Sequence, residues 1–127
     1  MNEETAKEWL KKAERDLKAA DVLLREGIYD YSLFHSQQAV EKYLKAFLTY
    51  HNKHFGKTHN IPLLVNLCKE IDLSFGDLLK LDFSILFPIG VTIRYPVDRE
   101  VTEEEAKEAI EIAEKVREFV LEKLGQG

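Results

Sequence analysis

The chain has 127 residues, of which 45% are hydrophobic and 32% are charged. These values are typical of one globular domain spanning residues 1–127, and they exclude a disordered chain. The formal net charge of −5 argues against a protein whose main task is to grip long nucleic acid, because phosphate neutralisation needs a net basic surface. RNA binding is therefore not favoured, although a local basic patch is compatible with the composition.

Cys68 is the only cysteine, so the sequence excludes an internal disulfide and a cysteine-based zinc site. Residues 1–5 are acidic and do not resemble a signal peptide, and no apolar stretch reaches the ~18 residues of a membrane-spanning helix. We therefore expect a cytoplasmic protein with no membrane contact. Abundant Lys and Glu with few Asn and Gln are typical of a thermophile.

The first predicted helix covers residues 5–25. Thr5 and Glu8 have the spacing of a capping box, and Gly27 is expected to end the helix. Apolar residues recur at three- and four-residue steps and predict one buried face: Ala6, Trp9, Leu10, Ala13, Leu17, Ala20 and Leu24.

The second predicted helix covers residues 31–52, with Asp30 as its expected N-cap. Most of one face is apolar, and that face consists of Leu33, Phe34, Gln37, Val40, Leu44, Phe47, Leu48 and His51.

Two shorter helices are predicted next. Asn60 or Thr58 caps the first, which tolerates Pro62 in its first turn, and a second runs from about Ser74 to Phe83. The last helix begins at a second capping box, formed by Thr102 and Glu105. These elements predict an all-α fold, an up-and-down antiparallel bundle of four to five helices.

Residues 84–101 break the helical pattern with two prolines, a glycine and several β-branched residues. A connection of this length without helical periodicity is unusual in a small domain. It is either a hydrophobic strap over one end of the bundle or a loop that forms part of a site.

The most informative polar residues lie on the second helix. Gln37 falls in the middle of the apolar face, Glu41 falls on its edge, and Lys45 is expected to drift outward one turn later. A half-buried carboxylate needs a cation, and Arg94 in the irregular loop is the expected partner of Glu41. This arrangement is either a structural ion pair or part of a pocket for a substrate or phosphate.

A second polar stripe on the same helix comprises Tyr31, His35, Gln38, Lys42 and Lys45. Such residues suit nucleotide contacts, and they also suit an ordinary solvated face. His59, just before the third helix, either orients the turn or faces a ligand. The histidine spacing predicts no metal site.

Four segments resemble the HEPN family, the higher eukaryotes and prokaryotes nucleotide-binding domain. Residues 7–26 resemble its first helix and residues 31–46 its second, while residues 58–64, which begin Thr58-His59-Asn60, and Arg94-Tyr95-Pro96 match later hallmarks in order and spacing. The resemblance implies an all-helical homodimer that works with a small nucleotidyltransferase in a toxin–antitoxin-like system. A nucleotide such as ATP is the implied ligand.

Other family members are metal-independent ribonucleases that use an R-x(4–6)-H motif. Arg94 is not followed by a histidine at that spacing, so the resemblance implies no catalytic residue here. Tyr95 directly follows Arg94, whereas the tyrosine modified in some members comes two residues after the histidine.

The resemblance instead implies nucleotide- or partner-binding residues at Gln38, Glu41, Lys42, Lys45, His59, Arg94 and Tyr95. Two alternatives stay open. One is a ribonuclease with a variant site in which His59 or His35 supplies the base, and the other is a helical scaffold without a ligand.

Overall fold

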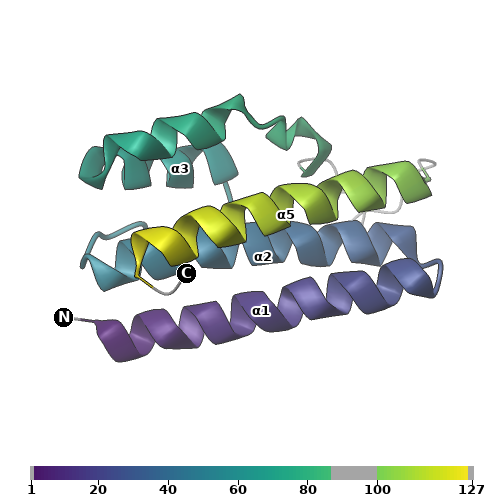
Figure 1. Cartoon of the computed structure of the whole chain (residues 1–127), viewed down its shortest axis with the longest axis horizontal. Helices are drawn as coiled ribbons and strands as arrows, with labels where there is room; N and C mark the ends of the chain where they lie inside the picture. The colour runs from purple at the N-terminus through teal and green to yellow at the C-terminus, as the bar shows by residue number, and fades with distance from the viewer. Residues whose placement is uncertain (1, 87–99, 126–127) are drawn as a thin grey trace.

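The computed structural model describes residues 2–86 and 100–125. Within these ranges the chain forms only helices: α1 (Glu3–Arg25), α2 (Tyr29–Tyr50), α3 (Ile61–Ile71), the 3₁₀ helices η1 (Leu73–Lys80) and η2 (Phe83–Leu86), and α5 (Glu103–Lys123). The predicted all-α fold is confirmed (Figure 1).

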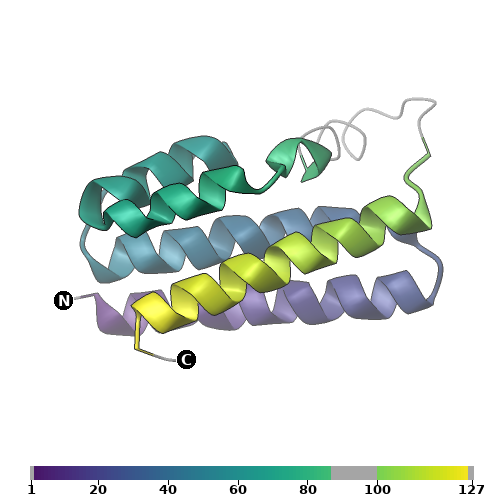
Figure 2. The same ribbon diagram turned by 45° about the horizontal axis from the view of Figure 1, so that its top comes forward.

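Helix α2 is the centre of the bundle. It forms an antiparallel hairpin with α1, and α5 packs along the hairpin while α3 and η1 lie on the opposite side from α1 (Figures 1 and 2). Because α2 is covered by several helices, its buried residues lie on more than one face; they include Leu33, Val40, Tyr43, Leu44 and Phe47. Polar residues on α2 are therefore partly enclosed as well.

The segment between α2 and α3 does not lead away from the bundle. It turns at Asn52, which has a positive φ of 58°, and runs back along α2 before α3 begins (Figures 1 and 2). The ring of Phe55 then lies beside that of Trp9 in α1, with the ring centres 6.3 Å apart. This returning loop, residues 51–60, covers part of α2 that the helices leave open.

Two of the predicted helix caps are confirmed. Thr102 and Glu105 form the reciprocal capping box at the start of α5. The side chain of Asn60 accepts the Leu63 N–H at the start of α3, and Pro62 occupies the first turn.

Two other caps were predicted wrongly. Helix α1 begins at Glu3, so Thr5 lies inside its first turn, and Asn2 occupies the N-cap position without a side-chain hydrogen bond. Helix α2 begins at Tyr29, so Asp30 lies inside the helix and accepts the backbone N–H of Tyr31. In both places the helix begins about half a turn earlier in the sequence than the short-range pattern predicts.

The predicted fourth helix is present as η1 and η2 and not as a regular α-helix. Asp72, and not Ser74, opens η1 by accepting the Ser74 N–H. Of the irregular segment at 84–101, residues 87–99 lie outside the described ranges, and Arg94 and Tyr95 are among them.

Candidate functional site

A ridge of buried polar side chains crosses α2 at Gln37, Glu41 and Lys45, which are 8%, 2% and 8% exposed. The predicted burial of Gln37 and Glu41 is confirmed. The expectation that Lys45 drifts outward was wrong, because Trp9 of α1 and Phe55 of the returning loop lie over its ammonium group. In the described part of the chain, Gln37 Oε1 has no hydrogen-bond partner.

Glu41 is held by two polar side chains. Its carboxylate lies 3.1 Å from His59 Nδ1 and accepts a hydrogen bond of 3.0 Å from Gln38 Nε2. Burial raises the pKa of the Glu41 carboxyl, while His59, Lys45 and Lys42 act in the opposite direction. The predicted partner Arg94 lies outside the described residues. Within the described residues, His59 makes the contact with Glu41 that was predicted for Arg94.

Lys45 lies between two aromatic rings. Its Nζ atom is 5.6 Å from the ring centre of Trp9 and 5.7 Å from that of Phe55, which is within cation–π range. Burial lowers the pKa of the Lys45 ammonium group, and the nearby Glu41 carboxylate raises it. The ridge thus contains two opposite charges that depend on each other for compensation.

The turn before α3 determines where His59 lies. Thr58 Oγ1 accepts the N–H of Asn60, and Asn60 in turn caps α3. Although its Nδ1 faces Glu41, the His59 side chain is 60% exposed. Both interpretations of His59 therefore fit the structure: it is fixed by the turn, and its outer edge is open to solvent.

A second polar cluster links α1 to α2. His35 and Lys42 were predicted on the polar stripe of α2, whereas their partner Asp16 was missed from the sequence. Asp16 Oδ1 lies 2.8 Å from His35 Nδ1, and Asp16 Oδ2 accepts a hydrogen bond from Lys42 Nζ. Asp16 directly precedes Leu17, which belongs to the apolar stripe of α1. Its partners, however, depend on the register between the two helices α1 and α2. That register cannot be read from one helix alone.

The five predicted site residues that the structure describes fall into one connected region. Gln38, Glu41, Lys45 and His59 form one group, and Lys42 lies between this group and Asp16. We call the residues Gln38, Glu41, Lys42, Lys45 and His59 the α2 site. Tyr31, which was predicted on the same polar stripe, is 49% exposed.

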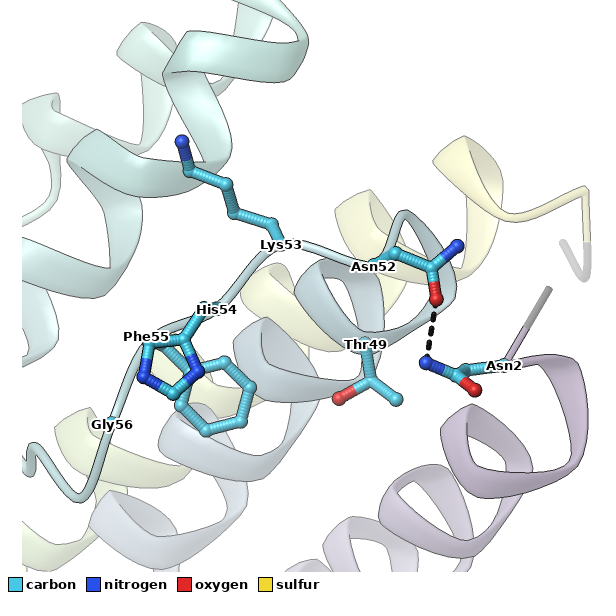
Figure 3. A pocket seen from close by; sticks show the side chains of 7 residues that line it. All are labelled: Asn2, Thr49, Asn52, Lys53, His54, Phe55 and Gly56. Carbon is cyan, nitrogen blue, oxygen red and sulfur yellow. Dashed lines mark hydrogen bonds between the residues drawn. The ribbon is translucent and has the colours of Figure 1, made fainter.

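A cavity of about 390 Å³ lies at the other end of the returning loop, where Figure 3 shows Asn2 bonded to Asn52. Its described lining is Asn2, Thr49, Asn52, Lys53, His54, Phe55 and Gly56. The Lys53 side chain points away from the other side chains (Figure 3). Its Nζ atom donates a hydrogen bond to Glu70 of α3. None of the predicted site residues within 2–86 and 100–125 lines this cavity.

Residues 2–86 and 100–125 contain no group of three side chains arranged to hold a metal ion. Within the same ranges, no helix is long and apolar enough to cross a membrane. Cys68 is fully buried, and burial raises the pKa of its thiol, so this side chain is part of the core.

Fold and site together define an all-α bundle whose central helix carries buried polar residues under a returning loop. The HEPN domain profile matches residues 6–124, and the chain belongs to the HEPN family. The protein "Putative toxin MJ1304" of Methanocaldococcus jannaschii is 34% identical, over 98% of this chain and 94% of that protein.

Two solved structures are similar over nearly the whole chain. The crystal structure of TT1696 from Thermus thermophilus is 28% identical with a TM-score of 0.72, covering 97% of this chain and 99% of the other. The crystal structure of ST0689, described as an archaeal HEPN homologue, is 25% identical with a TM-score of 0.62, covering 93% and 96%.

Proposed function

We propose that the protein is the HEPN component of a two-component system of the toxin–antitoxin kind. In this proposal it forms a homodimer in the cytoplasm and binds a small nucleotidyltransferase, with a nucleotide such as ATP at the contact. Membership of the HEPN family and the similarity to an archaeal protein that carries a toxin name support this assignment.

One observation supports the α2 site as the binding surface. Glu41 is 2% exposed, yet its partner His59 is 60% exposed, so a buried carboxylate is connected to the surface through one imidazole ring. Replacing buried ion pairs with apolar residues is often neutral or stabilising, so stability alone does not account for this arrangement. A ligand that contacts His59 would act on Glu41 and Lys45 as well.

Arg94 and Tyr95 complete the proposed surface. We assign phosphate contacts to Lys45 and Arg94 and base stacking to Tyr95, since guanidinium and ammonium groups bind phosphate and aromatic rings stack on bases. Arg94 and Tyr95 lie outside the described residues, so their roles rest on the family resemblance and are tested by substitution.

The test is co-expression with the small nucleotidyltransferase encoded nearest to this protein. Size-exclusion chromatography with light scattering, with and without ATP, measures the mass of any complex. We expect a mixed complex that His59→Ala and Arg94→Ala weaken and that the matched control His54→Ala, in the same loop, does not. A homodimer that ignores its neighbour under all conditions contradicts the proposal.

A metal-independent ribonuclease is the second candidate, and two acid–histidine pairs favour it. Asp16 contacts His35 and Glu41 contacts His59, each through Nδ1 of the imidazole. In both rings this leaves Nε2 as the nitrogen for proton transfer in attack by a 2′-hydroxyl. The test is cleavage of mixed RNA in the presence of EDTA. Cleavage by the wild type that is lost in His35→Ala or His59→Ala would establish this activity.

A further inference from the structure

A pocket of about 360 Å³ lies between α1 and α2, next to the α2 site but mostly outside it. Its described lining consists of Lys12, Arg15, Asp16, Ala19, His35 and Lys42. Of these lining residues only Lys42 belongs to the α2 site, so the pocket is a separate candidate binding site.

The lining is positively charged although the chain is acidic. Three cationic side chains, Lys12, Arg15 and Lys42, face a single carboxylate, that of Asp16, while the whole chain carries a net charge of −5. Both Asp16 oxygens are occupied, one by His35 and the other by Lys42. Asp16, the one acidic residue of the described lining, is therefore already paired with a cation that also lines the pocket, Lys42.

Several donors in the pocket have no competing partner in the part of the chain that the structure describes. Among the described residues, no ion pair involves Lys12 or Arg15, and both side chains are exposed. His35 uses Nδ1 to contact Asp16, which leaves Nε2 as the free ring nitrogen, and the side chain is 30% exposed. Asp16 thus positions an imidazole and an ammonium group beside two unpaired cations.

We propose that this pocket binds the phosphate groups of a small phosphorylated molecule. A guanidinium group, two ammonium groups and an imidazole supply donors that converge from two helices, and Arg15 can bind two phosphate oxygens at once. The volume is at the lower end of small-molecule sites, and the acidic chain disfavours a long polyanion. The pocket therefore suits a diphosphate or phosphate monoester better than a nucleic-acid strand.

Titration of the isolated protein with sodium pyrophosphate tests this proposal, with calorimetry and the His35 imidazole resonances as readouts. We expect the His35 signals to shift and the variant Lys12→Gln/Arg15→Gln to bind at least about tenfold more weakly. The matched control Lys11→Gln/Lys18→Gln removes the same charge from exposed positions of α1 outside the pocket. We expect it to bind within about twofold of the wild type at fixed ionic strength.

Three outcomes would overturn the proposal. The first is no binding of pyrophosphate up to about 10 mM, and the second is equal weakening by the control variant, which indicates a diffuse field. The third is tighter binding of tricarballylate or of a short single-stranded RNA than of pyrophosphate. Because no partner protein is present, failure here leaves the proposed partnership with a nucleotidyltransferase to its own co-expression test.

Discussion

Glu41 and His59 are 18 positions apart in the sequence, yet Glu41 Oε1 and His59 Nδ1 lie 3.1 Å apart. The contact exists because the chain runs back along α2 after Asn52, and it ties the returning loop to the central helix. At the same time it encloses a carboxylate that the helices alone would leave open to water.

Glu41→Gln should stabilise the protein at neutral pH. Because burial raises the folded-state pKa above the ordinary value of 4.5, the unfolded chain holds fewer protons than the folded chain as pH rises through this range. The stability contribution of Glu41 is therefore full below pH 4.5 and is lost as pH rises through the folded pKa. Glutamine removes the charge, keeps nearly the same side-chain shape and retains one oxygen that accepts hydrogen bonds. We expect a gain of about 1 kcal/mol, or about 4 °C in Tm, at pH 7, because burial disfavours the Glu41 charge more than His59, Lys45 and Lys42 compensate it.

Thermal unfolding of both proteins from pH 4 to pH 8 measures this effect. The difference in Tm should vanish near pH 4 and grow toward neutral pH. The exposed Glu111→Gln is the matched control and should change stability by less than about 0.5 kcal/mol at every pH. A Glu41→Gln variant that is less stable than wild type at pH 7 shows that the charge is net favourable.

Lys45→Met should show strong coupling to Glu41→Gln. Methionine alone removes the ammonium group that compensates Glu41, and we expect a loss of about 1 kcal/mol. In the double variant no charge is left to compensate, so stability should exceed the wild-type value by about 1 kcal/mol or more, as in Glu41→Gln alone. Urea unfolding of the four proteins gives a coupling energy of about 1 kcal/mol or more, whereas additivity within about 0.3 kcal/mol contradicts a shared electrostatic site.

The long helices could be predicted from sequence because their signals are local. The stripe of Ala13, Leu17 and Ala20 repeats at helical spacing, and the box of Thr102 and Glu105 needs only four residues. Burial of Gln37 and Glu41 followed from the same geometry, since both positions fall on or beside the apolar face.

The site could be predicted only in part because its contacts join segments distant in sequence. Burial of Lys45 depends on Phe55 coming back over α2, and nothing in either local pattern specifies that path. The partners of Asp16 depend likewise on the register of α1 against α2. Residue identities therefore indicated a polar ridge, while the pairing of its charges required the fold.

Phe55→Ala should loosen the cover over Lys45 and expose Trp9. Trp9 is the only tryptophan of the chain, and its ring has an edge contact with Phe55. Because Phe55 is half-buried, we expect a loss of about 1–2 kcal/mol, less than for a fully buried phenylalanine. The tryptophan emission maximum should shift to the red. Phe55→Leu keeps apolar cover and should shift it less, and an unchanged maximum in the alanine variant contradicts the predicted contact.

Asn60→Ala should weaken both α3 and the position of His59. The Asn60 side chain accepts the Leu63 N–H at 3.0 Å, and loss of such a cap costs about 1 kcal/mol. Asn60→Asp keeps an acceptor in place and is the matched control, with stability expected near that of wild type. Urea unfolding measures the loss, and the His59 imidazole resonances report whether the contact with Glu41 persists. If alanine and aspartate give the same stability, the cap does not hold the turn.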